Sequence, residues 1–491
     1  MPAAQQSIPM LPNIIGGESV KSTSSRKLEV TNPSTGEVMG EVPLSTSAEL
    51  DQAVKKAAAA QKDWAKLSLK DRVQVLFRLK ALMEDQADAL AELIARENGK
   101  TIPEAAGELA RAIECVEFAT SLPQIAAGQV LEVSRGVECK MYRYPLGVVA
   151  AITPFNFPMM VPMWMAPTAI AAGNALILKA SEQTPFSAVE LARLFDEAGL
   201  PKGIFSVVHG DREIVEAICD HPEIQAIGFV GSTKVAKLVY ERGCKHGKRV
   251  KALGGAKNHL VVMPDADVDM TVANVVASAT GCAGQRCMAA SVLLAVGEVD
   301  PILDKLKAKF KSMKAGKDIG AIISTQAKNR ILGFIEGASK EGAELAVDGR
   351  QSIDPSANPN GNFIGPTIFD RAKPQHAVSC DEIFGPTLTI VRCKTLDEAI
   401  SIENNNPYGN AAAIYTSSGE VAHYFMERAS AGMIGVNIGV PVPREPFPFG
   451  GWNDSSYGEG DLTGHGSFDF WTKTKKITTK WTDKNRSNWM S

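Results

Sequence analysis

The tetrapeptide Gly284-Gln285-Arg286-Cys287 combines a thiol with polar and cationic neighbours. A thiolate attacks carbonyl carbon efficiently, and the adjacent cation of Arg286 is expected to favour the thiolate over the thiol. The polar setting argues against an apolar pocket. Cys287 is therefore a candidate nucleophile. The alternative is one more core cysteine, which is the usual fate of a lone thiol.

Asn156 and Glu382 are candidate partners of that nucleophile. Asn156 lies in the uncharged, proline-rich segment Thr153–Pro158, and a buried amide must find hydrogen-bond partners. Its NH2 group could donate to the oxyanion that forms when a thiolate adds to a carbonyl, or it could close a turn. Glu382 precedes an apolar strand, where its carboxylate could hold a ribose, act as a base or lie on the surface.

The sequence contains neither the G-x-G-x-x-G dinucleotide fingerprint nor the G-x-x-x-x-G-K-[ST] phosphate loop. Two strand ends could still bind a nucleotide, because parallel sheets bind ligands at the carboxyl ends of their strands. In Lys179-Ala180-Ser181-Glu182, the carboxylate could accept bonds from both ribose hydroxyls and repel a 2′-phosphate, which favours NAD over NADP. The alternative is a solvated Lys/Glu pair.

In Phe229–Thr233, the amides at the start of a helix and the Ser232 hydroxyl could face a pyrophosphate. The alternative is that Ser232 is a plain N-cap.

The elements that must position these residues alternate along the chain. From Gly147 onward, short β-branched runs are separated by helical patterns, and a second alternating region follows Gly254-Gly255. This order predicts an α/β protein with two parallel sheets and helical crossovers, behind a helix-rich first portion. The predicted strands are Val148–Ile152, Ala175–Lys179, Phe205–Val208, Gln225–Val230, Leu260–Met263, Ser291–Val296, Gly365–Ile368 and Leu388–Val391. The predicted helices are Ser47–Gln61, Leu69–Asn98, Thr101–Ser121, Met160–Ala172, Phe186–Ala198, Glu213–Cys219, Lys234–Arg242, Val268–Gly281 and Ile302–Met313.

Both ends of the chain carry weaker signals. Phe470–Thr482 alternates Thr and Lys with apolar residues, which predicts a strand at a sheet edge or a subunit contact. Met1–Pro12 lacks Lys, Arg and a long apolar core, so it is neither a secretory signal nor an Arg-rich transit peptide, and we expect a loose tail.

Bulk properties exclude several classes of protein. The net charge is -3 without long runs of one sign, so neither nucleic acid nor an anionic membrane is an expected partner. The 8 cysteines form no C-x-x-C pair and no zinc-type grouping with His. We therefore expect no metal site and a reducing, cytoplasmic location. The uncharged stretch between Arg143 and Lys179 is interrupted by prolines, which favours a buried strand–loop–helix–strand over a membrane span.

Considered together, these motifs resemble those of the NAD(P)-dependent aldehyde dehydrogenases over nearly the whole chain, in the same order and at similar spacing. The motifs that carry the resemblance are Thr153–Pro158, Lys179–Glu182, Phe229–Ser232, Gly284–Cys287 and Glu382–Pro386. Within that family, Leu253–His259 and Gly284–Ala289 are similar to the CoA-acylating methylmalonate-semialdehyde dehydrogenases, with malonate semialdehyde as the close alternative substrate.

The resemblance implies a role for each candidate residue. Cys287 would be the nucleophile, with its backbone amide and the Asn156 side chain as the oxyanion hole. Arg111 and Arg286 would clamp the substrate carboxylate, and Phe157 would line the substrate pocket unless it only packs in the core. For Arg111, a solvated helix charge is the alternative. The implied NAD contacts are Thr153, Phe155, Lys179, Glu182, Gln183, Ser232, Gly254, Glu382 and Phe384.

Within that set, Lys179 and Glu182 would hold the adenosine ribose, Ser232 would contact the pyrophosphate, and Glu382 would hold the nicotinamide ribose. Gln183 departs from the Arg that the acylating subgroup often carries beside the ribose-binding Glu.

The resemblance also implies an aldehyde dehydrogenase-like fold. Residues 1–128 and 147–253 would form a discontinuous NAD-binding domain, and residues 254–452 the catalytic domain. Residues 129–146 and 470–491 would form a strand arm that joins subunits into a homodimer or homotetramer.

Ala252 is the departure with the largest chemical consequence. Hydrolytic members of the family carry a glutamate directly before Leu-Gly-Gly, where this chain has alanine. Loss of a general base slows hydrolysis by roughly 10²–10⁴. A thioester on Cys287 would then wait for a thiol, so the resemblance implies coenzyme A as co-substrate and propionyl-CoA or acetyl-CoA plus CO2 as products. The alternatives are a hydrolytic dehydrogenase of another small aldehyde and a non-catalytic protein on this fold.

Overall fold

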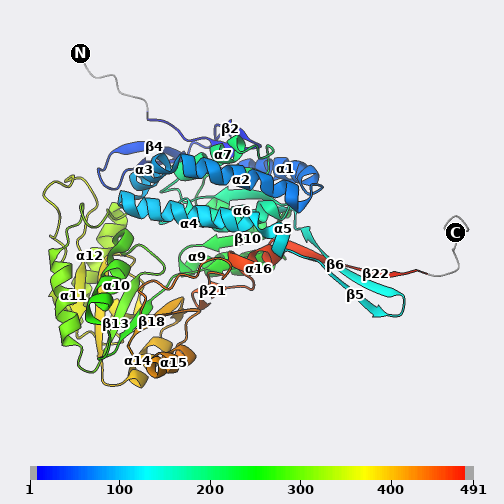
Figure 1. The fold of residues 1–491 in the computed structure, drawn as a ribbon. Helices are drawn as coiled ribbons and strands as arrows, with labels where there is room; N and C mark the ends of the chain where they lie inside the picture. The colour runs from blue at the N-terminus through cyan, green and yellow to red at the C-terminus, as the bar shows by residue number, and fades with distance from the viewer. Residues whose placement is uncertain (1–7, 482–491) are drawn as a thin grey trace, which may run out of the picture.

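In a computed structural model, which describes residues 8–481, two large sheets flanked by helices form most of the chain (Figure 1). The first sheet contains, in spatial order, β2 (Glu18–Val20), β1 (Asn13–Ile15), β9 (Phe205–Val207), β8 (Ala175–Lys179), β7 (Val148–Ile152), β10 (Ile224–Val230), β11 (Arg249–Leu253) and β21 (Ser456–Tyr457). The second contains β14 (Glu344–Val347), β15 (Thr367–Asp370), β16 (Thr387–Cys393), β13 (Ala290–Val296), β12 (Asn258–Val262), β18 (Ala411–Tyr415) and β19 (Met433–Val436).

Both sheets are parallel at their centres. In the first, β9, β8, β7, β10 and β11 run parallel, and the antiparallel strands lie at the edges. In the second, all pairs are parallel except β14 with β15. The α/β class with two parallel sheets, predicted from the alternation of elements, is confirmed.

Helices cover both faces of the first sheet. They are α1 (Ser47–Trp64), α2 (Leu69–Asp85), α3 (Ala87–Asn98), α4 (Ile102–Thr120), α5 (Leu122–Ile125), α6 (Met160–Ala171), α7 (Phe186–Glu197), α8 (Arg212–Asp220), α9 (Thr233–Lys245) and α16 (Gly464–Phe470). The second sheet is flanked by α10 (Val268–Thr280), α11 (Asp300–Ser312), α12 (Thr325–Lys340), α13 (Ala377–Cys380), α14 (Leu396–Asn404) and α15 (Gly419–Arg428). Each sheet has its own hydrophobic core.

The uncharged stretch between Arg143 and Lys179 forms the centre of the first core. It supplies β7, β8 and the connecting helix α6, whose residues are almost all buried. Strands covered on both faces require continuous apolar runs, which explains why this stretch has no charges. Among the described residues, no helix combines the length and the apolar content needed to cross a bilayer.

The strand order of the first sheet reverses between β7 and β10. From β7, the chain moves outward in one direction to β8 and β9, and then returns to β10 on the other side. Connections leave such neighbouring strands in opposite directions, so a crevice opens at their carboxyl ends. The segments that follow β7, β8, β10 and β11 are those that contain Asn156, Glu182, Ser232 and Gly254.

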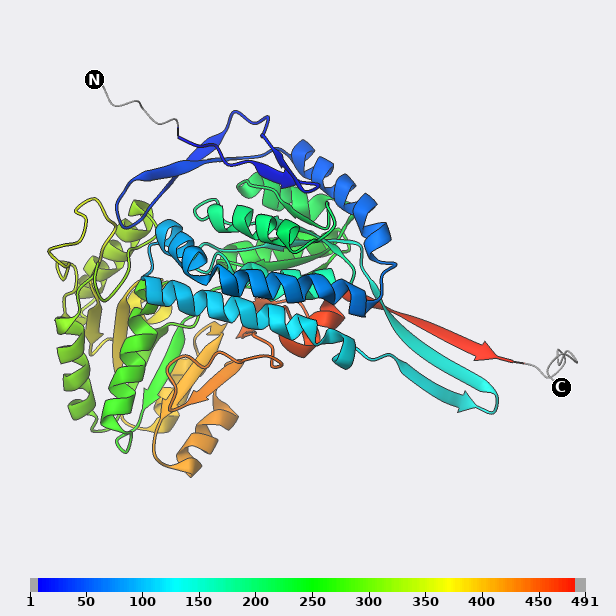
Figure 2. The ribbon, with the colours of Figure 1, turned by 45° about the horizontal axis from the view of Figure 1, so that its top comes forward.

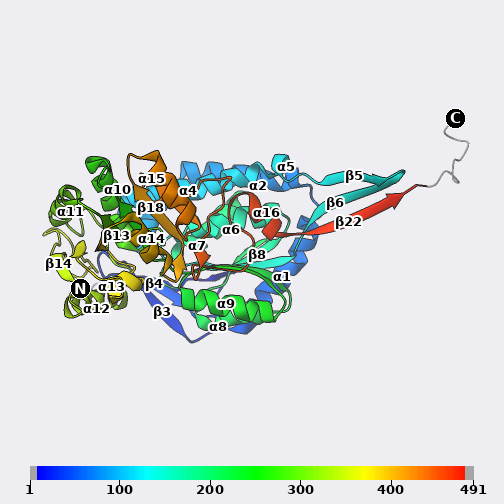
Figure 3. The ribbon, with the colours of Figure 1, turned by 90° about the horizontal axis from the view of Figure 1, so that it is seen from below.

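A separate antiparallel sheet of β5 (Gln129–Ser134), β6 (Val137–Pro145) and β22 (Thr472–Lys480) projects from the body. Figure 2 shows these strands as a narrow arm, and Figure 3 shows the arm extending from the end of the molecule opposite α11 and α12. The outer strand β5 is exposed along its whole length; Val130 and Leu131 are 63% and 66% exposed.

Several element boundaries differ from the prediction. The single helix predicted over Leu69–Asn98 is two helices, because the backbone leaves helical geometry at Gln86 (φ −103°, ψ 17°). The strand predicted from Phe470 begins at Thr472, because Phe470 ends α16, and residues beyond 481 lie outside the described part.

The N-terminal part was also wrongly predicted. Residues 1–7 lie outside the described part, but the rest of the expected loose tail is held in place: Leu11 donates to the Glu41 carbonyl at 2.8 Å and is buried against Val30 and Val42. The short strands β1 to β4, including β3 (Lys27–Thr31) and β4 (Val38–Pro43), were not predicted, nor were the two-residue strands β17 (Tyr408–Gly409) and β20 (Trp452–Asn453).

Asn174, fully buried, ties the arm to the core. Its amide oxygen accepts from the backbone amides of Leu146 (2.7 Å) and Gly147 (3.0 Å), and its Nδ2 donates to the carbonyls of Ala169 (3.0 Å) and Trp471 (2.9 Å). We expect Asn174→Ala to lower the free energy of unfolding by about 3 kcal/mol, because several buried backbone groups lose this partner. Urea unfolding measures the loss. The control Asn405→Ala removes an exposed amide with one bond and should change stability by less than about 0.5 kcal/mol.

Candidate active site

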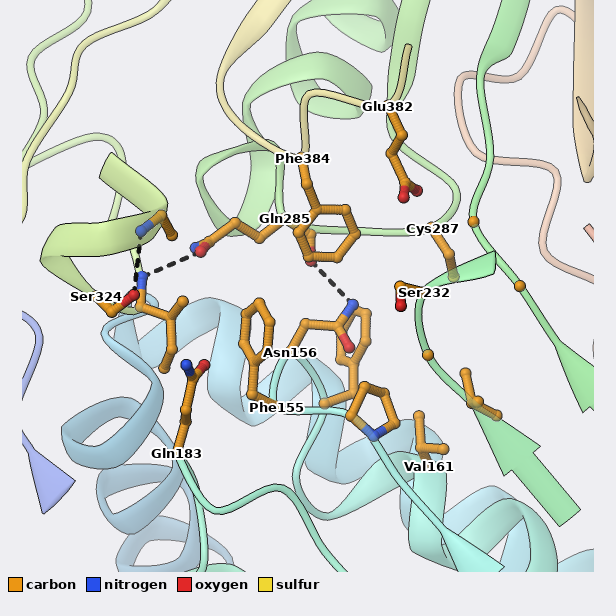
Figure 4. A pocket seen from close by; sticks show the side chains of 18 of the residues that line it. Phe155, Asn156, Val161, Gln183, Ser232, Gln285, Cys287, Ser324, Glu382 and Phe384 are labelled. Atoms are coloured by element: carbon orange, nitrogen blue, oxygen red, sulfur yellow. Dashed lines mark hydrogen bonds between the residues drawn. The ribbon is translucent and has the colours of Figure 1, made fainter. Parts of the chain in front are cut away.

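A cavity of about 420 Å³ lies where the carboxyl edge of the first sheet meets the second sheet. Loops that follow β7, β10 and β11 form one wall, and the residues that precede β13 and β16 form the other. The predicted site residues that line it are Phe155, Asn156, Phe157, Gln183, Ser232, Gly254, Cys287, Glu382 and Phe384. Figure 4 shows the side chains of Asn156, Cys287 and Glu382 entering this cavity from the two sheets.

A left-handed turn presents Cys287. Cys282, Ala283 and Gly284 have φ values of 52°, 53° and 69°, and they reverse the chain after α10. Left-handed geometry costs non-glycine residues roughly 1–2 kcal/mol each. At Gly284 a side chain would also collide with the Gly385 carbonyl, so glycine is required there. The strained turn is held by Glu104, whose carboxylate accepts from the Cys282 amide.

Two asparagines fix the backbone of Cys287. The Nδ2 groups of Asn258 and Asn410 each donate to the Cys287 carbonyl at 2.8 Å. The Asn258 amide also bonds to the Ala289 carbonyl and the Ala411 amide, so it links three neighbouring segments. Sequence reasoning missed both residues. Asn258 lies within Leu253–His259, which carried the family resemblance, whereas Asn410 had no sequence signal.

Asn156 joins the two walls. Its Nδ2 donates to the backbone carbonyl of Gln285 at 2.9 Å (Figure 4). The Gln285 side chain is itself buried, donating to the Ala321 carbonyl at 3.2 Å and accepting from the Ile323 amide at 3.0 Å. An amide NH2 group has two hydrogens, so one remains for an acceptor in the cavity.

Burial raises the pKa of the Cys287 thiol to about 12, and the nearby charge of Glu382 acts in the same direction. Arg286 opposes this shift but does not overcome it. The expected direction of the Arg286 effect is therefore confirmed, but its size is too small to give a low thiol pKa in the protein without ligands. Removal of water from around a charged sulfur outweighs the attraction of one cation.

Arg286 does not line the cavity. Its Nη2 donates to the carbonyls of Ala277 (2.5 Å) and Ser278 (3.0 Å) at the C-terminal end of α10. The last carbonyls of a helix lack intrahelical partners and carry partial negative charge, so they compete for the guanidinium. In this structure the guanidinium is therefore directed to the helix end and not to the cavity, and a role at a substrate carboxylate stays a prediction.

Arg111 is also outside the cavity lining. Its guanidinium forms ion pairs with Glu114 on the same helix and with Glu445 at 3.3 Å. The alternative reading of Arg111 as a solvated helix charge does not hold either, because most of the side chain is buried. Both arginines expected at the substrate carboxylate thus have other partners.

The candidate cofactor residues fall into two groups. Phe155, Gln183, Ser232, Gly254, Glu382 and Phe384 line the cavity. Thr153, Lys179 and Glu182 do not; Lys179 Nζ donates to the Glu182 carboxylate at 2.9 Å. Ser232 is the N-cap residue of α9, yet its hydroxyl makes no capping bond, and the residue lines the cavity.

These residues fit a dinucleotide such as NAD. The α9 N-terminus faces the cavity with its free amides, which suits a pyrophosphate. The Gln183 Oε1 and the Thr153 Oγ1 are buried, and neither has a hydrogen-bond partner among the described residues. The Glu382 carboxylate accepts from the Ala256 amide at 2.9 Å, and burial raises its pKa.

The remaining wall is apolar. Phe155 and Phe384 contact edge to face with ring centroids 5.8 Å apart, and Trp164 packs on Phe449 at 4.6 Å. Phe157, Val161 and Trp164 complete this side. Apolar surface therefore lies on this side of the cavity that Cys287 also lines.

Comparison with known proteins matches residues 19–477 to the aldehyde dehydrogenase family. The chain is 48% identical to malonate-semialdehyde dehydrogenase 2 of Geobacillus kaustophilus over 96% of this chain and 99% of that protein. It is 46% identical to malonate-semialdehyde dehydrogenase of Halalkalibacterium halodurans over 96% and 98% of the two chains.

Solved structures give the same result. A methylmalonate-semialdehyde dehydrogenase from Oceanimonas doudoroffii matches with a TM-score of 0.95 at 40% identity, over 97% of this chain and 99% of that one. An NAD complex from Sinorhizobium meliloti 1021, provisionally assigned to the same activity, matches with a TM-score of 0.96 at 42% identity, over 98% and 100%. The predicted aldehyde dehydrogenase-like fold and the resemblance to this family are confirmed.

The raised thiol pKa predicts a pH dependence. Below a pKa of about 12, the thiolate fraction rises about tenfold per pH unit. We expect the rate of Cys287 alkylation by iodoacetamide in the ligand-free protein to rise by about that factor per unit between about pH 7 and pH 10. Mass spectrometry of the Cys287 peptide, with Cys287→Ser as control, measures the rate. A plateau below about pH 9 would contradict the burial argument.

Proposed function

The chain belongs to the aldehyde dehydrogenase family, and we propose that it oxidises malonate or methylmalonate semialdehyde with NAD and transfers the acyl group to coenzyme A. The observation that carries this proposal is the pairing of Cys287 and Asn156 in one cavity, without a glutamate at position 252. Ala252 lies within β11, and its side chain is fully buried.

The substrate class is supported by the relatives. Their names specify malonate semialdehyde for the curated proteins and methylmalonate semialdehyde for the two solved structures. The two compounds differ by one methyl group, which is worth only roughly 1–3 kcal/mol in a pocket. The apolar wall of Phe157, Val161 and Trp164 suits either. Arg111 and Arg286 have other partners in this structure, so they do not support the choice of an acidic aldehyde. The support for that choice comes from the relatives.

The first half-reaction uses Cys287 and Asn156. The thiol loses its proton to a water molecule, Sγ bonds to the aldehyde carbon, and the carbonyl electron pair moves onto oxygen. The second hydrogen of Asn156 Nδ2 and the Cys287 amide then donate to the oxyanion. When bound, NAD supplies the hydride acceptor. Collapse of the oxyanion with loss of hydride leaves a thioester on Cys287, inside walls that exclude water.

The second half-reaction depends on which nucleophile can attack the thioester. Glu382 is the single acidic residue among the described residues that line the cavity, and its assigned role is to hold the nicotinamide ribose. Water then lacks a free base, whereas a thiol needs no strong base to exchange at a thioester. The β-carboxylate can leave as CO2 when its C–C electron pair forms the thioester enolate, which then takes up a proton. Coenzyme A receives the resulting acyl group.

The remaining cofactor assignments complete the proposal. Glu182 and Lys179 would hold the adenosine ribose with Gln183 beside them, Ser232 would contact the pyrophosphate, and Thr153, Phe155, Gly254 and Phe384 would line the cleft. Glu182 directly precedes Gln183, which lines the cavity and whose buried Oε1 has no hydrogen-bond partner among the described residues, and this supports the placement.

We also propose a homodimer or homotetramer built through β5, β6 and β22. The exposed edge strand β5, with its apolar side chains, supports this role, since such edges favour pairing with another strand.

In this proposal, residues 1–128 and 147–253 bind NAD and residues 254–452 supply the nucleophile. The 8 cysteines are all free, which supports a reducing location such as the cytoplasm.

Omission of coenzyme A tests the acyl transfer. With NAD and either semialdehyde but no coenzyme A, we expect about one NADH per active site and then slow turnover. Addition of coenzyme A should restore steady NADH formation, and Cys287→Ala should produce no NADH while still binding NAD. Fast turnover without coenzyme A would instead support the hydrolytic alternative.

Ala252→Glu should supply the missing base. We expect the rate of water-dependent release of the acyl group to rise by roughly 10²-fold, which is the lower end of the range for general-base catalysis. The matched control is Ala252→Gln, which has nearly the same volume but no basic carboxylate. Deacylation measured in single turnovers should accelerate in the Glu variant alone; equal rates in both variants would count against the argument.

A further inference from the structure

The turn between α3 and α4 binds the loop that contains Asn156. Asn98 Nδ2 donates to the Phe155 carbonyl at 2.9 Å, and Lys100 Nζ donates to the Asn156 carbonyl at 2.7 Å. These two carbonyls belong to the peptide groups on either side of the Asn156 Cα. Because each peptide group is planar, anchoring both of them fixes the two backbone torsions of Asn156.

Lys100 is fully buried, and so is its partner Glu108, 2.6 Å away. The Lys100 ammonium also lies 4.3 Å from the centre of the Phe157 ring. The second oxygen of Glu108 accepts from the amides of Met159 (2.9 Å) and Met160 (3.2 Å) at the start of α6. Apart from the ion pair itself, each of these contacts is with a residue in the range 155–160. The ion pair therefore holds one short segment, and neither of its residues lines the cavity.

The same turn reaches the opposite wall. The Gly99 carbonyl accepts from the Ala321 amide at 2.7 Å, and the Ala321 carbonyl accepts from the Gln285 side chain at 3.2 Å. The turn thus anchors Asn156 directly and Gln285, its hydrogen-bond partner, through one intermediate residue.

A buried ion pair is a costly way to stabilise a fold, because desolvation costs several kcal/mol per ion and hydrophobic replacements are often as stable. The benefit here is geometric, since an oxyanion donor must be held in place before the reaction. Resting on the proposed function, we infer that Lys100 and Glu108, assisted by Asn98, are positioning residues that set the oxyanion-binding geometry of Asn156.

The test is a double-mutant cycle between this network and Asn156. The network variant is Lys100→Met/Glu108→Gln, which removes both charges together and keeps the acceptor for the Met159 and Met160 amides. We expect it to lower kcat by roughly 10- to 100-fold, in line with small misplacements of catalytic groups, with the Kd for NAD changed less than about threefold. In the Asn156→Ala background, the same change should lower kcat by less than about twofold.

The outcomes separate the two proposals. A network effect that is equally large with and without Asn156 would overturn the positioning role and leave a structural one. If Asn156→Ala alone leaves kcat unchanged, the proposed oxyanion chemistry fails instead. If the network variant does not fold, the same cycle is measured with Asn98→Ala, which removes no charge. Additive losses of kcat for Asn98→Ala and Asn156→Ala would also overturn the inference.

A matched control comes from another buried lysine. Lys248 Nζ also donates to backbone carbonyls, at 2.7 Å to Ile224, but lies away from the Asn156 loop. Lys248→Met should lower thermal stability without any coupling to Asn156→Ala. Coupling of similar size at Lys248 would show that the cycle reports general loss of stability and would overturn the inference.

Discussion

The hydrogen bond from Asn156 to the Gln285 carbonyl is the contact on which the site depends, because it joins loops that belong to different sheets. One loop leaves the carboxyl end of β7, at the point where the strand order of the first sheet reverses. The other follows a left-handed turn that costs energy at Cys282 and Ala283. The relative position of Cys287 and Asn156 is thus set by the packing of the elements around the two sheets. Hydrogen bonds made by Glu104, Gln285, Asn258 and Asn410 hold the surroundings of the strained turn.

The sequence predicts most reliably those features that are local and repeated. β7 is a continuous apolar run, and β8 and β10 are mostly apolar, so their alternation with helices was enough to predict a parallel sheet and the strand ends that carry Asn156 and Ser232. β11, which contains Arg249 and Lys251, was not predicted. The failures are those in which a side chain had more than one possible partner. The substrate roles of Arg286 and Arg111 came from the family resemblance and from charge, and neither tells whether a guanidinium faces a cavity, a helix end or a glutamate. Asn410, 123 residues from the carbonyl that it binds, gives no local pattern at all.

Burial has two opposite effects on Cys287. The apolar walls around Phe157 and Trp164 keep water from an acyl intermediate, but the same exclusion of water raises the pKa of the thiol. A general base at position 252 could take the proton from the thiol and so offset its raised pKa. The same base would also activate water, and the acyl intermediate would then be hydrolysed. With Ala252, that position offers no base, and the raised pKa of the thiol favours its protonated form in the free protein.

This trade-off suggests why the rigidity of the oxyanion loop matters more here than in a hydrolytic site. Without a base to assist either step, stabilisation of the tetrahedral adduct must come mainly from fixed donors, and fixed donors act only if they need no rearrangement when charge develops. The loop Thr153–Pro158, although it contains two prolines, does not fix a side-chain amide by itself. The buried pair of Lys100 and Glu108, with Asn98, supplies that restraint from behind, where its charges face neither the substrate nor the thiol directly. The physical requirement is therefore met by a network outside the cavity, and the cavity itself can remain largely apolar.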